Sequence, residues 1–127
     1  MLFRSETELD LADGDPVAVL GFSQGGAMAL EAALALPVAA IVSCSGYPHS
    51  RGLRLPEADA PLPSVLLLHG RHDPVVPVGA LDQLQQSLRS AGVPVETAVF
   101  ACDHTIPAEA VDAVTVFLGR ITEAAGS

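Results

Sequence analysis

The sequence predicts an α/β fold in which about four parallel strands are flanked by helices. Short apolar segments alternate with segments of helical periodicity, which is the pattern of consecutive strand–helix units. Half of the 127 residues are hydrophobic, more than an average soluble chain carries. Such a surplus is expected of parallel strands, because helices cover both of their faces. At this length, residues 1–127 form a single domain.

The strands are short apolar runs, expected near residues 17–21, 38–43, 65–69 and 95–100. A first helix, about 24–36, follows the first strand directly and makes residues 27–42 almost wholly apolar. A membrane span is the alternative interpretation of this stretch. Glu31 would be costly at the centre of a bilayer, and Pro37 interrupts the run, so we expect a buried helix and strand and no membrane span.

Two further helices complete the alternation. A helix near 78–91 ends at Gly92, a natural helix stop, and carries one apolar stripe that comprises Leu81, Leu84, Leu88 and Ala91. The last helix has Pro107 in its first turn. Its apolar residues are expected to face inward, namely Val111, Val114, Phe117, Leu118 and Ile121.

The segment Gly21-Phe22-Ser23-Gln24-Gly25 joins the first strand to the first helix. It has the Gly-x-Ser-x-Gly form of a nucleophile elbow, a sharp strand-to-helix turn that lifts a serine hydroxyl above the sheet. Gly21 and Gly25 are expected to be glycines because a Cβ at either position would collide across the turn. The turn also directs the first N–H groups of the helix at anything bonded to the Ser23 oxygen.

Two further residues complete the chemistry that a serine nucleophile needs. Asp73 and His104 each follow a predicted strand, so both lie at the carboxyl edge of the sheet, where sites form in open α/β folds. The order serine, aspartate, histidine is that of nucleophile-elbow hydrolases. We expect His104 to take the Ser23 proton and return it to the leaving group. Asp73 would hold the imidazole tautomer and stabilise the imidazolium.

These motifs resemble the phospholipase/carboxylesterase family of α/β-hydrolases, which includes the acyl-protein thioesterases. The segments that carry the resemblance are Gly21-Phe22-Ser23-Gln24-Gly25-Gly26, His69-Gly70 with Asp73-Pro74-Val75-Val76-Pro77, and His104 with Ile106-Pro107. The resemblance runs from about Val17 to the last helix. It implies Ser23, Asp73 and His104 as the catalytic triad, and the backbone N–H of Gln24 as one oxyanion donor.

The chain departs from the family pattern in two places. Cys102-Asp103 precedes the histidine, where the family usually has glycine. We expect none of the family's N-terminal strands before Gly21, nor the loop that supplies the second oxyanion N–H, and we expect residues 1–15 to form an acidic leader. The resemblance therefore implies the C-terminal half of an α/β-hydrolase fold, a truncated domain. Its first strand would be an unprotected edge that favours a homo-oligomer or a partner chain, and the isolated chain would be a weak catalyst.

A Pro-rich segment, residues 46–63, starts at the catalytic edge and is too long for a plain connection. We interpret it as a lid-like loop or substrate wall, with a passive surface loop as the alternative. The residues expected to line a substrate pocket come from this loop and from the three motifs: Phe22, Tyr47, Leu53, Leu55, Val75 and Ile106.

A metal site is the alternative interpretation of the residues around the triad. The residue types that metals bind are present as His69, His72, Asp73, Cys102 and His104. However, His69-x-x-His72 lies at a strand end, without the helix face and glutamate base of a metalloprotease motif. We therefore expect no metal and no cofactor, with His69 packed or hydrogen-bonded at the strand end. Cys102 is not expected to be a nucleophile, because the elbow holds a serine.

The net charge of −9, with no lysine, argues against nucleic acid or an anionic membrane surface as a partner. Two cysteines provide no disulfide framework and the first residues contain no apolar signal segment, so a cytoplasmic location is expected. The predicted function is a serine hydrolase that cleaves small-molecule carboxylic esters or thioesters through an acyl-enzyme. The alternatives are a catalytically impaired hydrolase fragment that acts as an interaction subunit, and a cofactor-free peroxidase that uses the same triad.

Overall fold

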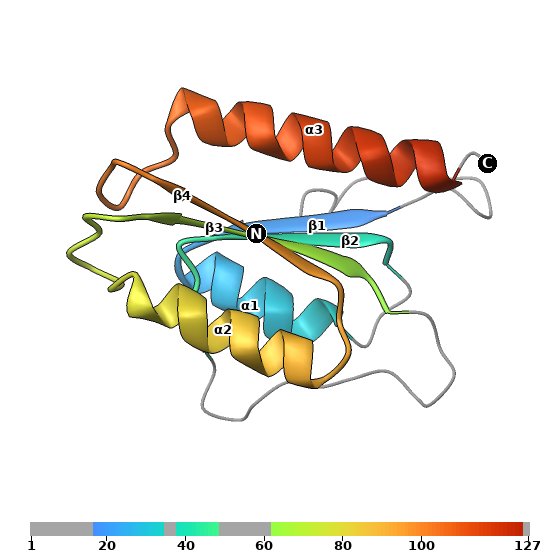
Figure 1. Ribbon diagram of the computed structural model, residues 1–127, viewed down its shortest axis with the longest axis horizontal. Helices are drawn as coiled ribbons and strands as arrows, with labels where there is room; N and C mark the ends of the chain where they lie inside the picture. Colours follow the sequence, from blue (N-terminus) through green and yellow to red (C-terminus); the bar gives the residue numbers. More distant parts are fainter. Residues whose placement is uncertain (1–16, 35–37, 49–61, 126–127) are drawn as a thin grey trace.

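Four strands form one sheet in which every neighbouring pair is parallel (Figure 1). The computed structural model describes residues 17–34, 38–48 and 62–125. In chain order the elements of these ranges are β1 (Ala18–Phe22), α1 (Gln24–Ala33), β2 (Ala40–Cys44), β3 (Ser64–Gly70), α2 (Gly79–Ser90), β4 (Val95–Phe100) and α3 (Ala108–Ala125). The order in the sheet, β1-β2-β3-β4, follows the order in the chain. The predicted α/β fold with about four parallel strands is confirmed.

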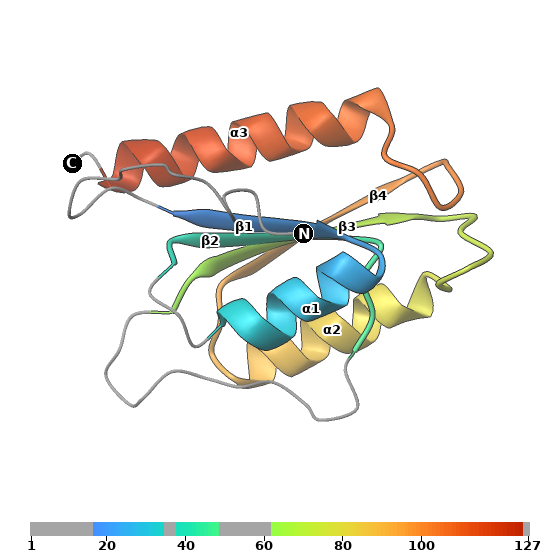
Figure 2. The same ribbon diagram turned by 180° about the vertical axis from the view of Figure 1, so that it is seen from behind.

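Helices cover both faces of the sheet, with α1 and α2 on one side and α3 on the other (Figures 1 and 2). The face under α1 and α2 is packed with aliphatic side chains, including Val19, Leu30, Ile41, Leu67, Leu84 and Leu88. The face under α3 holds a second cluster, formed by Ala40, Val42, Cys44, Leu66, Leu68, Ala110 and Phe117. The central strands β2 and β3 are therefore buried on both faces, which explains their continuous apolar runs.

The bounds of the elements lie close to those expected from the sequence. β4 occupies residues 95–100 as expected, and the ends of β1, β2, β3 and α2 differ from expectation by one or two residues. After α2, Gly92 has a φ of 82°, the left-handed conformation that glycine commonly adopts beyond a helix end. The leucines of the expected stripe on α2, Leu81, Leu84 and Leu88, are buried, and Ala91 packs against the same cluster.

One predicted core position in α3 is wrong. Val111 is 55% exposed, whereas the adjacent Ala110 is fully buried. Ala110 and Phe117 lie two turns apart and form the line of α3 that faces the sheet; partly buried beside them are Val114, Leu118 and Ile121. Because successive residues on a helix are separated by about 100°, a helix with Ala110 against the sheet turns Val111 away from it. The apolar residues of α3 are too numerous to define one narrow stripe.

The apolar stretch over residues 27–42 is divided between α1 and β2, with residues 35–37 outside the described ranges. Within those ranges, no helix combines the length and the apolar character needed to cross a membrane. The acidic leader, residues 1–15, lies outside them, and so do residues 49–61 of the loop 46–63. The leader and the lid-like loop therefore stay predictions.

Candidate active site

Ser23 lies at the turn between β1 and α1 with φ 57° and ψ −117°. A positive φ is uncommon for a residue with a side chain and strains the backbone at this point. The Ser23 N–H donates to the carbonyl of Cys44 at 2.7 Å, which ties the turn to the end of β2. A Cβ on Gly21 would overlap the carbonyl of Gly25, so the turn requires glycine at position 21. The same requirement at position 25 stays a prediction.

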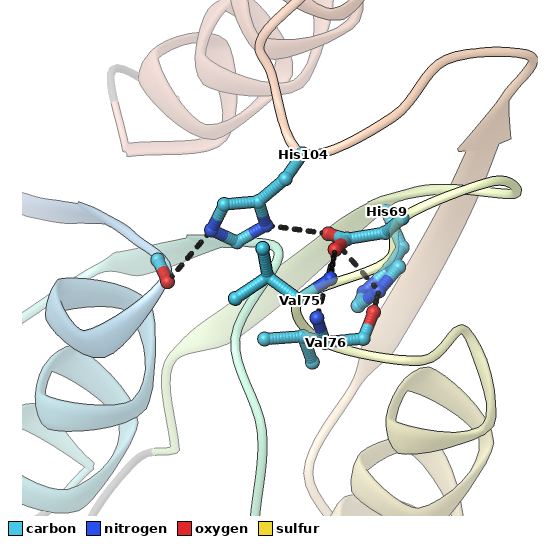
Figure 3. Close-up of polar contacts among 6 residues, drawn as sticks. His69, Val75, Val76 and His104 are labelled. Carbon is cyan, nitrogen blue, oxygen red and sulfur yellow. Dashed lines mark hydrogen bonds and ion pairs between the residues drawn. The ribbon is translucent and has the colours of Figure 1, made fainter.

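His104 lies between Ser23 and Asp73 (Figure 3). Its Nε2 is 2.9 Å from the Ser23 hydroxyl oxygen, and its Nδ1 is 2.6 Å from Asp73 Oδ2. An ionised carboxylate only accepts hydrogen bonds, so Nδ1 carries the proton and Nε2 is free to accept one from the serine. The three residues follow β1, β3 and β4, whose carboxyl ends meet at one edge of the parallel sheet. The fold thus brings together three side chains that are far apart in the sequence.

Asp73 is held by two backbone donors in addition to His104. Its side chain is fully enclosed, and Oδ1 accepts the N–H groups of Val75 and Val76, each at 2.8 Å (Figure 3). Burial alone would raise the pKa of Asp73. The hydrogen bonds from His104, Val76 and Val75 outweigh burial and hold this pKa below its ordinary value of 3.8. The carboxylate is therefore ionised at neutral pH, as it must be to stabilise an imidazolium.

The loop after β3 makes two backbone hydrogen bonds, one to the end of β4 and one to the loop after β4. They run from the N–H of Arg71 to the carbonyl of Phe100 (2.8 Å) and from the N–H of His72 to the carbonyl of Cys102 (3.0 Å). Gly70 lies at this junction, where a Cβ would overlap the carbonyl of Asp103 and lie 2.6 Å from that of Cys102. Gly70 was not predicted to matter in this way. The available signal was a glycine at the end of a buried strand, which often marks a close backbone approach.

Of the six residues expected to line a substrate pocket, four lie within the described ranges and two lie outside them. The ring of Phe22 lies 4.8 Å from the ring of His104, between centroids, so Phe22 borders the site. Val75 is 64% exposed and Ile106 is 47% exposed, on the loops that carry Asp73 and His104. Tyr47 is half-buried after β2. Outside the described residues lie Leu53 and Leu55, and the pocket as a whole stays a prediction.

The expected oxyanion donor, Gln24, is the first residue of α1 and directly follows Ser23. N–H groups in the first turn of a helix have no partner within the helix and carry its positive dipole end. The first turn of α1 contains no acidic residue that would neutralise this end. Gln24 therefore lies where an N–H could stabilise negative charge on an atom bonded to Ser23.

Two of the three histidines weighed as metal ligands have other hydrogen-bond partners. His69 Nε2 makes a hydrogen bond to the Val76 carbonyl, and His72 is exposed. The two ring nitrogens of His104 make hydrogen bonds with Ser23 and Asp73. In the part of the chain that the structure describes, no group of three or more histidine, cysteine or acidic side chains is arranged to hold a metal ion.

Both cysteines are free thiols close to this edge of the sheet. Cys44 is buried, and its burial, with a smaller contribution from Cys102, raises the pKa of its thiol to about 11. A thiol with so high a pKa stays protonated and is a poor nucleophile. Cys44 is therefore not a candidate nucleophile, and the turn before α1 holds Ser23.

Known proteins resemble this chain over most of its length. The chain matches the structure of esterase PE8 with a TM-score of 0.74 and 32% identity, over 93% of this chain and 54% of that one. It matches the protein Atu2452 of unknown function from Agrobacterium tumefaciens str. C58 with a TM-score of 0.71 and 30% identity, over 84% and 52% of the two chains. SOBER1 from Arabidopsis thaliana shares the fold, with a TM-score of 0.75 and 24% identity over 87% and 55%.

The chain thus spans about half the length of these solved structures. No curated protein matches it significantly. The family model described as Phospholipase/Carboxylesterase matches residues 5–122, which is nearly the whole sequence. The chain therefore belongs to the phospholipase/carboxylesterase family.

Proposed function

We propose that this chain carries the active site of a serine hydrolase that cleaves carboxylic esters or thioesters through an acyl-enzyme. The observation that carries the proposal is the pair of hydrogen bonds from Ser23 through His104 to Asp73 at the carboxyl ends of three parallel strands. Family membership supports hydrolase chemistry, and one of the similar structures is that of a named esterase.

The proposed reaction is an acyl transfer in two stages. Ser23 Oγ attacks the carbonyl carbon while its proton passes to His104 Nε2, and the negative oxygen that forms is stabilised by the Gln24 N–H. His104 then gives the proton to the departing alkoxide or thiolate, and the Ser23 ester remains. Water attacks this ester while His104 takes one of its protons. His104 then returns that proton to Ser23 Oγ as the bond to the acyl carbon breaks, which releases the carboxylic acid and restores the serine.

The surroundings of His104 favour a substrate with an apolar part. Phe22 lies against the imidazole, and Val75 and Ile106 present exposed apolar side chains on the adjacent loops. Isolated exposed apolar residues are common on protein surfaces, but here two of them lie on the loops of Asp73 and His104, beside the half-buried Phe22. They would contact the acyl chain or the alcohol of a small-molecule ester.

The proposal is tested by labelling the chain with a fluorophosphonate, which reacts with activated serines whatever the natural substrate. The label should be found on Ser23 alone by mass spectrometry. Ser23→Ala should abolish labelling and lower ester turnover by on the order of 10⁶. The matched control is Ser90→Ala, at an exposed serine that ends α2, which should leave both unchanged. A label on Ser43 or Ser45, or full turnover in Ser23→Ala, would contradict the assignment.

A second candidate function rests on the first strand. In the described ranges β1 pairs only with β2, and α3 packs over β2, β3 and β4. The side chains of β1 on the α3 side are left partly exposed, namely Ala18, Leu20 and Phe22. An unpaired edge beside an incompletely covered face is a template for another strand. The alternative is thus a catalytically impaired hydrolase fragment that acts as an interaction subunit, in which Ser23 would resist the fluorophosphonate.

A further inference from the structure

A second histidine, His69, lies at the end of β3 beside the catalytic carboxylate. Its side chain is 1% exposed, and its Nε2 lies 2.7 Å from the carbonyl oxygen of Val76 (Figure 3). A carbonyl oxygen only accepts hydrogen bonds, so Nε2 carries a proton and donates it. This hydrogen bond joins the two ends of the loop that contains Asp73.

Val76 connects His69 to Asp73. Its carbonyl accepts from His69, and its N–H donates to Asp73 Oδ1 at 2.8 Å beside the N–H of Val75. These two donors occupy Oδ1, which leaves Oδ2 for His104 Nδ1 at 2.6 Å. His69 Nε2 also lies 3.7 Å from Oδ2, beyond a hydrogen bond but close enough for its N–H dipole to favour the negative charge.

We propose that His69 is a positioning residue that acts through Val76 to hold the Asp73 carboxylate with Oδ2 directed at His104. Without the His69 donor, the buried carbonyl of Val76 would lose its partner and the loop would rearrange to satisfy it. Asp73 would then stabilise protonated His104 less well. What this means for catalysis rests on the proposed function, whereas the effect on His104 protonation rests on the hydrogen-bond geometry alone.

Few other charged groups face this carboxylate. Within the described ranges, the basic side chains within 4 Å of it are His69 from β3 and His104 from the loop after β4. The titratable neighbours along the two loops are Arg71, His72 and Asp103, which are exposed, and Cys102, which is half-buried. Because His72 is an exposed histidine of the same loop, His72→Gln is a matched control for substitutions of His69.

Three variants separate the hydrogen bond from the volume of the ring. His69→Leu removes the donor. His69→Gln keeps an N–H group at about the reach of Nε2, and His69→Asn carries an amide that is too short to reach the Val76 carbonyl. If His69→Leu does not fold, the comparison of the two amides still tests the hydrogen bond.

The direct readout is an NMR titration of the His104 Cε1–H signal. In His69→Leu and His69→Asn the midpoint of this titration should move to lower pH by about 0.5–1 pH unit, because a less well oriented carboxylate favours the neutral imidazole. His69→Gln and His72→Gln should titrate like the wild type. An unchanged midpoint in folded His69→Asn would overturn the inference, whether or not Ser23 is reactive.

The catalytic readout is the rate at which a fluorophosphonate modifies Ser23 as a function of pH. In His69→Leu and His69→Asn the plateau rate should fall by up to about 10²-fold, the effect of misplacing a catalytic group by about 1 Å. The acid limb should move to lower pH, and His69→Gln should restore both. A role in folding alone would lower the thermal midpoint and leave the acid limb in place. A shifted His104 titration with no labelling in the wild type would contradict the proposed function and leave the positioning role supported.

Discussion

Replacing Gly70 by alanine tests whether the close approach of two loops sets the position of His104. Gly70 ends β3, three residues before Asp73, and the chain after β4 crosses directly over it. The added methyl group would overlap the carbonyl of Asp103, the residue that precedes His104. Because the obstructing atoms belong to the backbone, a change of rotamer cannot relieve the overlap, and the loop itself must move.

The size of the movement follows from the contact distances. The Cβ would lie 2.6 Å from the Cys102 carbonyl oxygen, whereas ordinary contacts of a Cβ begin at 3.4 Å, so the loop must shift by about 0.8 Å or more. The Nδ1–Oδ2 distance of 2.6 Å and the Nε2–Oγ distance of 2.9 Å would both be disturbed by such a shift of His104. A misplacement of about 1 Å can cost on the order of 10² in rate, and overpacking typically costs about 1–3 kcal/mol of stability.

The assay compares kcat on a small ester with the free energy of unfolding in urea. Gly70→Ala should lose about 10²-fold in kcat, because His104 is displaced while the Ser23 elbow is untouched. The variant should remain folded. The control is Gly119→Ala on the exposed side of α3, where an added Cβ meets nothing within 4 Å. This control should keep full activity and gain about 0.5–1 kcal/mol from the better helix former. A folded Gly70→Ala with kcat within twofold of the wild type would refute the reasoning.

Three further predictions concern Asp73 and β1. Asp73→Asn should lower kcat by on the order of 10⁴, because an amide holds the wrong imidazole tautomer. The pKa of Asp73 is lowered by folding, so the stability that its charge contributes is present above 3.8 and is lost as the pH falls through the lower, folded-state value. Urea titrations should therefore show wild-type stability falling in that acidic range more than that of Asp73→Asn. The 127-residue chain should self-associate through the β1 edge in size-exclusion chromatography with light scattering, and Ala18→Lys should reduce association more than Ala108→Lys on α3. A wild type that is monomeric at all concentrations would contradict this expectation.

The sheet could be predicted from the sequence because its signals are local and strong. β2 and β3 each contain an uninterrupted apolar run, residues 40–42 and 65–68, as burial on both faces requires, and β4 covers a segment rich in β-branched residues that ends at Phe100. The proximity of Ser23, Asp73 and His104 could be anticipated for a topological reason. In a parallel sheet the carboxyl ends of all strands lie at one edge, so residues that directly follow different strands meet there.

The face of α3 that packs against the sheet could not be predicted in the same way. The helix is long and has apolar residues on several sides, so its periodicity does not say which line faces the sheet. Packing decides in favour of Ala110 and Phe117, and it leaves Val111 and Val116 in solvent. The small side chain of Ala110 allows a close approach to the sheet that valine would prevent.

The hydrogen bonds that orient Asp73 were also beyond sequence reasoning, because their donors are backbone N–H groups that every residue except proline possesses. What the sequence does contain is the pair His69-Gly70 at the end of β3. Successive residues of a strand point to opposite faces of the sheet, so the two positions serve different loops. On one face His69 holds the loop of Asp73 through the Val76 carbonyl, and on the other the missing side chain of Gly70 admits the loop of His104. We therefore expect two adjacent residues at the end of β3, His69 and Gly70, to set the distance between Asp73 and His104 although neither of them is part of that pair.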